Sequence, residues 1–371
     1  MIENLRRKAG YALCSLVLLS LLSVPAELLA CGPASSPVKL PYALNDATSV
    51  YTGEKAYIFG GATVSSEGAG QILDKILCYD PADSSLSELP TRLPLQVKAA
   101  RSFWDGRSAY IFSGVNRSGV PLDYLVRFTP PEKVEYWEHF FPYGLKGCSV
   151  AWTDQFAYIF GNCVCTSLNT TRQNVIRLDP ATLNFTVIRD ALPLQLAGTS
   201  AVWTGQYAYI FGGRTPDGTA TADLDSIYRF DPATEMCALM KARLPSPRYS
   251  TGAVMKDGKA DIFGGDCASG SLDQVLVYDP AVDRLSVPDL KLPYNMSTSS
   301  YVLVEDQILI FGAKTAGTSP DTVEVVTLKP APKAAPAQSL SKGELTLVAI
   351  LMGFIALVAI GTFFSRRNPG K

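Results

Sequence analysis

The most regular feature of the chain is a short apolar phrase that recurs six times. The copies occupy residues 57–61, 110–114, 158–162, 209–213, 261–265 and 309–313, and their isoleucines are 48 to 53 residues apart. Each copy runs through consecutive apolar residues and most end in glycine, which predicts a short strand covered on both faces. The glycines would allow a close backbone approach that a side chain would block.

Two further markers keep the same register along the chain. A hydrophobic residue followed by proline precedes each copy, with the proline 17 residues before the isoleucine: Pro41, Pro94, Pro142, Pro193, Pro245 and Pro293. An Asp-Pro pair or a variant of it follows each copy and ends at Pro81, Pro130, Pro180, Pro232, Pro280 and, in a weakened form, Pro330. Asp-Pro is typical of a type I turn, in which the aspartate caps and the proline fixes φ.

Each unit of about 50 residues therefore predicts four strands, which we name a to d. Strand b is the apolar phrase, strand a precedes it, strand c ends at the Asp-Pro turn, and strand d runs from that turn to the next marker proline. Four short strands at this spacing resemble the blade of kelch-repeat proteins, and the resemblance covers about residues 33–330. It implies an all-β fold over residues 31–330, a six-bladed β-propeller.

The last unit supplies strands a, b and c but no strand d. Residues 33–40 precede the first marker proline and have no earlier blade to join. We expect this N-terminal segment to form strand d of the last blade. That arrangement closes the ring and covers sheet edges that would otherwise favour aggregation, and kelch propellers are known to use it.

The N-terminal end predicts export. Arg6, Arg7 and Lys8 precede an apolar run over residues 11–24, and small residues follow. This is the pattern of a secretory signal peptide, which we assign to residues 1–30. The alternative is an uncleaved anchor, although the apolar run is short for a helix that spans a bilayer.

The C-terminal end predicts a membrane anchor. Residues 345–364 carry no charge and, as a helix, would be about 30 Å long. Arg366, Arg367 and Lys371 follow, which favours a cytoplasmic tail at residues 365–371 and a single-pass topology. A buried core helix is the alternative. Residues 331–344 begin with a Pro/Ala-rich stretch and predict a stalk, so the propeller would face the extracellular or luminal side.

The composition of the chain limits the ligands and catalytic groups that we expect. Hydrophobic residues make up 47% of the chain, the net charge is −1 and no basic block interrupts the repeats, so we expect no nucleic-acid partner. The single histidine, His139, excludes a copper site of the kind that needs two histidines and leaves an iron site poorly supported. We expect His139 to pack beside Phe140 and Phe141, and we expect no metal, no cofactor and no catalytic residue.

Loop lengths locate the expected binding surface. The step from strand b to the Asp-Pro turn varies between 18 and 23 residues, whereas the step from that turn to the next marker is 12 or 13. In kelch propellers the variable b–c loops share a face with the d–a loops, and variable loops on a rigid scaffold usually carry binding residues. The candidates are Glu67, Arg117, Arg214, Asp217, Arg248, Tyr249 and Asp266.

The predicted function is therefore a non-enzymatic, membrane-anchored scaffold that binds a protein or glycan ligand on the loop face. The alternative is a carbohydrate-active propeller, since a sialic acid mutarotase is also a six-bladed kelch protein. Such an enzyme would need a carboxylate and a base converging on the central channel, and the sequence does not place them.

The sequence also contains candidate sites for N-glycosylation, for a disulfide and for lipidation. Four N-x-S/T acceptors would suit a glycoprotein: Asn116, Asn169, Asn184 and Asn295. Glycans on the first two and on Asn295 would shield part of the loop face and leave blades 4 and 5 as the contact zone. Cys237 and Cys267 are candidates for a disulfide in an exported protein. Cys31 follows a sequence similar to a bacterial lipoprotein cleavage box, so lipidation there is an open alternative.

Overall fold

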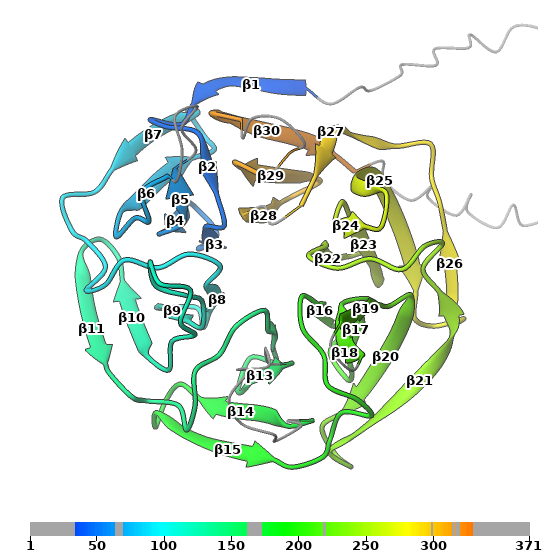
Figure 1. Ribbon diagram of the computed structural model, residues 1–371. Helices are drawn as coiled ribbons and strands as arrows, with labels where there is room; N and C mark the ends of the chain where they lie inside the picture. The colour runs from blue at the N-terminus through cyan, green and yellow to red at the C-terminus, as the bar shows by residue number, and fades with distance from the viewer. Residues whose placement is uncertain are drawn as a thin grey trace, which may run out of the picture. The chain divides into compact units, whose positions relative to one another are not determined.

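The computed structural model describes residues 34–63, 70–161, 173–217, 220–297, 300–313, 315 and 320–328. Regular structure in these ranges is all β-strand, and the main strands form six sheets arranged in a ring (Figure 1). The predicted six-bladed all-β propeller is confirmed. None of the described residues forms a helix long and apolar enough to cross a bilayer. The predicted signal peptide, stalk, membrane helix and tail lie outside the described ranges.

Each blade follows the predicted order of strands from the inside of the ring outwards. Blade 1 contains β3 (Thr48–Tyr51), β4 (Ala56–Phe59), β6 (Ile76–Asp80) and β7 (Ser85–Glu88). Blade 2 contains β8 (Arg101–Trp104), β9 (Ala109–Phe112), β10 (Leu125–Thr129) and β11 (Lys133–Trp137). Blade 3 contains β12 (Ser149–Trp152), β13 (Ala157–Phe160), β14 (Val175–Asp179) and β15 (Asn184–Ile188). Blade 4 contains β16 (Ser200–Trp203), β17 (Ala208–Phe211), β20 (Ser226–Asp231) and β21 (Met236–Arg243). Blade 5 contains β22 (Gly252–Lys256), β23 (Lys259–Phe263), β25 (Gly270–Asp279) and β26 (Arg284–Ser286). Blade 6 contains β28 (Ser300–Val304), β29 (Gln307–Phe311), β30 (Thr322–Thr327) and β1 (Ala34–Lys39).

Short strands outside this plan extend the loops. Blade 4 carries a hairpin of β18 (Arg214–Asp217) and β19 (Ala220–Asp223), and blade 5 pairs β24 (Asp266–Cys267) with the start of β25. In blade 1, β2 (Leu44–Asn45) pairs with β5 (Ala62–Thr63), and β27 (Lys291–Met296) pairs with β25.

The apolar phrases form the core. In all six blades the last four residues of strand b are buried, as predicted for a strand covered on both faces. The hydrophobic core is divided into six clusters, and each cluster combines residues from two neighbouring blades. Every blade is therefore held mainly by its two neighbours.

The predicted ring closure is confirmed by the pairing of β1. This strand runs antiparallel to β30, with Ala34 opposite Val325 and Lys39 opposite Thr322. The main chain of Leu40 also donates a hydrogen bond to the carbonyl of Asp321 (2.7 Å). The N-terminal segment is thus the outer strand of the last blade, as Figure 1 shows.

The glycines after strand b fit tightly against loop backbone. A Cβ added to Gly212 would lie 2.4 Å from the carbonyl oxygen of Arg248, and one added to Gly60 would lie 2.5 Å from that of Val97. Both residues have positive φ, +56° and +59°. In blade 2 Ser113 takes this position with φ 67°, and its Oγ donates to the equivalent carbonyl, that of Leu145 (3.0 Å). The predicted close approach is confirmed.

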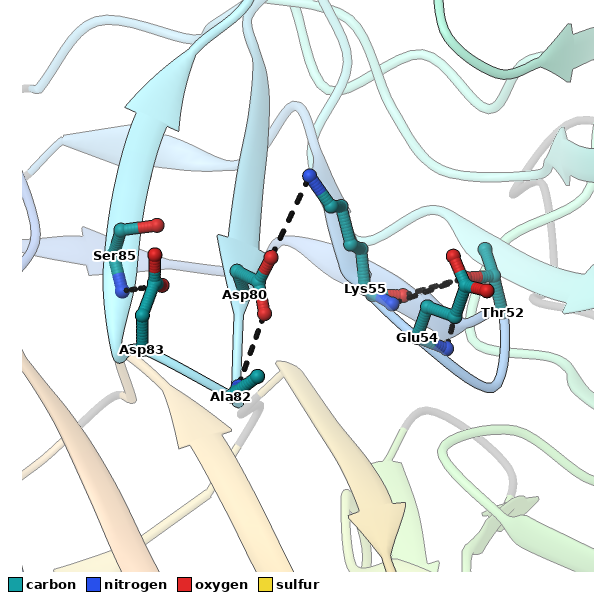
Figure 2. Close-up of polar contacts among 7 residues, drawn as sticks. All are labelled: Thr52, Glu54, Lys55, Asp80, Ala82, Asp83 and Ser85. Carbon is teal, nitrogen blue, oxygen red and sulfur yellow. Dashed lines mark hydrogen bonds and ion pairs between the residues drawn. The ribbon is translucent and has the colours of Figure 1, made fainter.

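The opposite face of the ring carries the a–b and c–d turns, shown for blade 1 in Figure 2. Asp80 accepts a hydrogen bond from the Ala82 N–H (3.0 Å), as predicted for the Asp-Pro turn, and forms an ion pair with Lys55 at 3.5 Å. The same aspartate cap occurs in blades 3, 4 and 5, at Asp179, Asp231 and Asp279.

Removal of the closing strand should destabilise the whole ring. Deleting residues 33–40 exposes the edge of β30 and opens the core shared by blades 6 and 1, so we expect the unfolding temperature to fall by about 10 °C or more. Thermal unfolding followed by circular dichroism measures this. A control chain that lacks only residues 31–32, which precede β1, should melt normally. An unchanged melt for the longer deletion would show that the ring does not depend on β1.

Two glycines have nearly the same positive φ but different surroundings. Comparing them separates the cost of placing alanine at a positive φ from the cost of a steric clash with its methyl group. Gly213 (φ +96°) would place a Cβ 2.6 Å from Thr199 Cγ2 and 2.8 Å from the Ala197 carbonyl oxygen, whereas Gly106 (φ +95°) has nothing within 4 Å of that position. Both Gly→Ala changes carry a backbone cost of about 1–2 kcal/mol. We expect Gly213→Ala to cost at least about 2 kcal/mol more than Gly106→Ala in denaturant unfolding. Equal costs would mean that the blade seam tolerates the methyl group.

Candidate functional site

The loop face is organised by one pairing that recurs in four blades. A residue of the d–a loop forms an antiparallel bridge with the residue four positions after the marker isoleucine of the same blade. The pairs are Asn45 with Ala62, Lys98 with Val115, Ala197 with Arg214 and Tyr249 with Asp266. The b–c and d–a loops therefore start side by side on one face, as the sequence predicted.

A cavity of about 350 Å³ opens between the innermost strands. Its volume is at the lower end of the range for small-molecule sites. All six blades contribute to its wall, mostly through residues at the start of strand a. Most side chains that line it are small or carry hydroxyl groups: Ala47, Thr48, Ser49, Ala99, Ser102, Ser149, Thr199, Ser200, Ala201, Ser250, Thr251, Ala253 and Ser300.

Hydrogen bonds made by side chains cross every seam between neighbouring blades around this cavity. Hydroxyl pairs cross three seams: Thr48 Oγ1 with Ser102 Oγ between blades 1 and 2 (2.7 Å), Ser149 Oγ with Thr199 Oγ1 between blades 3 and 4 (2.8 Å), and Ser200 Oγ with Thr251 Oγ1 between blades 4 and 5 (2.7 Å). The other three seams are crossed by bonds from Arg101 Nε to Cys148 O between blades 2 and 3 (2.8 Å), from Ala253 N to Tyr301 Oη between blades 5 and 6 (3.0 Å), and from Ser49 Oγ to Tyr301 O between blades 1 and 6 (3.0 Å). Each bond is worth about 1 kcal/mol, and together they fix the shape of the cavity wall.

Three charged residues line the cavity: Asp46, Arg101 and Lys146. Arg101 begins strand a of blade 2, where other blades have threonine, serine or glycine. Its Nη1 also donates to the Ala100 carbonyl (3.0 Å), so the backbone holds the guanidinium at the wall. The charges sum to +1, which favours an acidic group in the ligand.

None of these three residues was predicted from the sequence, although a signal for Arg101 was present. Aligning the six units on their marker isoleucines places Arg101 ten positions before the isoleucine, beside Thr48, Ser149 and Ser200. Because strand a is innermost, a charged side chain at that position lines the central cavity.

Blades 4 and 5 together present a second cluster close to the cavity. The Arg214 guanidinium lies over the ring of Tyr249, 3.4 Å from its centroid, and forms an ion pair with Asp223 at 2.9 Å. A Cβ added to Gly198, a cavity residue, would lie 3.3 Å from the Cβ of Tyr249. The structure thus brings together Arg214 and Tyr249, which were both predicted as binding residues, and leaves both partly accessible.

Two other predicted binding residues lie beneath the surface. Arg248 is completely buried and Asp266 is 6% exposed, so the expectation that either contacts a ligand directly is wrong for this conformation. The error has a physical origin, because membership of a loop does not give side-chain direction. The Arg248 side chain is buried and bonds to Ser246 and Gln274, while its neighbour Tyr249 lies against Arg214.

The remaining candidates are spread along the same loops. Arg117 is exposed in the turn after Asn116, and Asp217 ends β18 opposite Ala220. Glu67 lies outside the described residues. The structure therefore groups Arg214, Tyr249, Arg248 and Asp266 but does not bring Arg117 to them.

The predicted glycosylation sites stay predictions. Asn184 begins β15 and Asn295 lies in β27, and both side chains are exposed. Asn116 is half-buried, and its Oδ1 accepts the N–H groups of Ser118 (2.9 Å) and Val120 (3.1 Å). Asn169 lies outside the described residues.

The predicted cysteine pair is not formed in the structure. Cys237 and Cys267 are both free thiols. Cys237 packs against the core cluster of blades 3 and 4, whereas Cys267 lies in the b–c loop of blade 5. Cys31 lies outside the described residues.

His139 does not pack in the core as expected. Its side chain is 78% exposed, and Nδ1 lies 2.9 Å from Asp123 Oδ2. The hydrogen bond to Asp123 raises the pKa of His139. Within the described ranges, no group of three or more histidine, cysteine or acidic side chains is placed to hold a metal ion.

Two comparisons with known proteins agree with this architecture. Residues 147–331 match the family described as the KLHDC2/KLHL20/DRC7 Kelch-repeats domain. A Kelch domain-containing protein of Archaeoglobus fulgidus is 27% identical over 240 residues, which cover 55% of this chain and 74% of the relative. These similarities support the kelch-type repeat that the sequence markers predict.

Proposed function

We propose that this chain is a non-enzymatic binding scaffold that captures a protein segment on its loop face, at the mouth of the central cavity. The observation that carries the proposal is the central cavity, to which all six blades contribute. Among the described residues of its wall, Arg101 and Lys146 outnumber the one carboxylate, that of Asp46. An acidic side chain or a chain terminus of the partner would place its charge there. The similarity to kelch repeats supports a protein partner.

The cluster of Arg214 and Tyr249 would supply the rest of the interface. Tyrosine and arginine are the residue types that most often dominate binding energy. Here the guanidinium is held by both the ring and Asp223, so little conformational entropy is lost when a partner binds. The predicted contact zone on blades 4 and 5 would then extend from this cluster to the cavity.

A glycan is the alternative ligand, and one observation favours it. Ser300 lines the cavity, is 3% exposed, and its Oγ has no hydrogen-bond partner among the described residues. A sugar hydroxyl reaching that atom would satisfy it.

A peptide screen tests the function. The full chain in detergent is exposed to a phage library of random 12-residue peptides and, in parallel, to a glycan array. We expect acidic peptides to be enriched, and Lys146→Glu should weaken their binding at least tenfold because it reverses a charge at the cavity. Lys55→Ala, on the opposite face, should change binding less than twofold. Selection of glycans alone would favour the alternative ligand, and loss of binding in Lys55→Ala but not in Lys146→Glu would contradict the proposed face.

We further propose that residues 345–364 anchor the chain in a membrane after residues 1–30 have directed its export. Deleting residues 345–364 should move the chain from the membrane pellet to the supernatant after alkaline carbonate extraction, because the deletion removes the apolar span. Asn184→Gln should remove one N-glycan from the full chain, seen as a mobility shift. An intact chain that is extracted by carbonate would contradict the anchor.

A further inference from the structure

The mouth of the central cavity is bordered by d–a loop residues with left-handed backbone. In the five loops that the structure describes at this position, these residues are Asp46 (φ 54°), Ala99 (56°), Gly147 (66°), Gly198 (65°) and Ser250 (54°), and all five line the cavity. Hydrogen bonds between main-chain groups join most neighbours. The N–H of Ala99 donates to the carbonyl of Asp46 (2.7 Å), that of Gly198 to Gly147 (2.6 Å) and that of Ser250 to Gly198 (2.7 Å).

This series of bonds is interrupted at the seam of blades 2 and 3. Among the described residues, the N–H of Gly147 has no acceptor, so it does not pair with the carbonyl of Ala99. Arg101 bridges the seam instead. Its Nε donates to the carbonyl of Cys148 (2.8 Å), the residue after Gly147, and its Nη1 donates to that of Ala100 (3.0 Å). Gly147 is only half-buried and lines the cavity, so its N–H is open to a ligand oxygen.

Two cations accompany this N–H. Arg101 is fixed to the main chain beside Gly147 through Nε and Nη1, and its Nη2 has no acceptor in the described part of the chain. Lys146 directly precedes Gly147 and also lines the cavity. Within the described ranges no ion pair involves either cation, so the carboxylate of Asp46 pairs with neither.

These three groups suit a phosphate better than a carboxylate. A carboxylate has one negative charge and two oxygens, whereas a phosphate monoester has a charge of about −1.5 to −2 at neutral pH and three strong acceptor oxygens. The two unpaired cations supply two positive charges. Arg101, Lys146 and the Gly147 N–H together supply three donor groups, and hydrogen bonds from charged donors to phosphate oxygens are stronger than neutral ones.

We propose that the seam of blades 2 and 3 forms a phosphate-binding subsite of the cavity, in which Arg101, Lys146 and the Gly147 N–H hold a phosphate monoester. The inference rests on the proposed function for the carrier of that group, which would be a phosphorylated side chain of the captured protein segment. Because the main chain already fixes Arg101, the subsite exists before the ligand arrives.

Three small ligands that share a phenyl ring test the subsite: phenyl phosphate, phenyl sulfate and benzoate. Each is titrated into the full chain in detergent at constant ionic strength and about pH 7.5, where the phosphate ester is a dianion. Binding is followed through the proton NMR signals of the ligand. We expect phenyl phosphate to bind at least tenfold more tightly than the two monoanions. Equal affinity for either monoanion, or no binding of phenyl phosphate, would overturn the subsite.

Two lysines at equivalent loop positions provide a matched control. Lys146 and Lys98 each lie thirteen residues before a marker isoleucine, but only Lys146 is among the described residues that line the cavity. Lys146→Ala should weaken the binding of phenyl phosphate at least fivefold, and Lys98→Ala should weaken it less than twofold. Equal losses in the two variants would mean that general surface charge attracts the ligand, which would refute the subsite.

Arg101→Thr tests the group that bridges the seam, because blade 1 has threonine, Thr48, at the equivalent position. It should weaken the binding of phenyl phosphate at least tenfold in a chain whose thermal melt shows that it is folded, and unchanged binding would contradict the role of Arg101. The lysine variants decide the matter if this chain does not fold.

The result is separable from that of the peptide screen. Selection of acidic peptides by a chain that binds phenyl phosphate no better than benzoate would refute the phosphate subsite and leave the proposed function standing. Tight binding of phenyl phosphate by a chain that selects no peptide would support the subsite and contradict the protein partner.

Discussion

The main-chain hydrogen bonds between β1 and β30 join segments at opposite ends of the propeller, with Ala34 opposite Val325. Because each core cluster belongs to two blades, no blade is complete without both neighbours. The cluster between blades 6 and 1 includes Val38 of the closing segment and Val325 of its partner strand. Loss of this pairing would therefore remove Val38 and Leu40 from the core between blades 6 and 1 and leave the edge of β30 unpaired.

Closure of the ring also explains how the groups on the loop face are held in position. A closed ring fixes the distance between neighbouring inner strands, so the hydroxyl pairs Ser149–Thr199 and Ser200–Thr251 can form at 2.8 and 2.7 Å. The glycines after strand b allow the loops to lie against the neighbouring blade with no intervening side chain. The cavity and the stacked pair Arg214–Tyr249 are thus positioned by the scaffold, and a partner would meet a surface that is already organised.

The repeat predicted the fold well because its markers are local. Isoleucine, glycine and Asp-Pro report strand burial, close backbone approach and turn geometry, and all three interpretations agree with the structure. The candidate site was predicted only in part. Loop membership identified Arg214 and Tyr249, but it could not show that Arg248 points inwards or that Arg101 lines the cavity. Those facts depend on the direction of each side chain. Packing between the blades determines that direction, and sequence spacing does not give it.

The position of β1 has a consequence for biosynthesis. Its partner strand ends at Thr327, so the first propeller segment to emerge from the ribosome must wait for almost the last one before it can pair. At about 5–20 residues per second, the 291 residues that follow Ala34, up to and including Val325, take roughly 15–60 s to translate. Blades 1 to 5 can assemble during that interval, but the edges at the seam of blades 6 and 1 stay open to other chains until β30 has been translated. Crowded expression should therefore yield strand-exchanged oligomers in which β1 of one chain closes the ring of another.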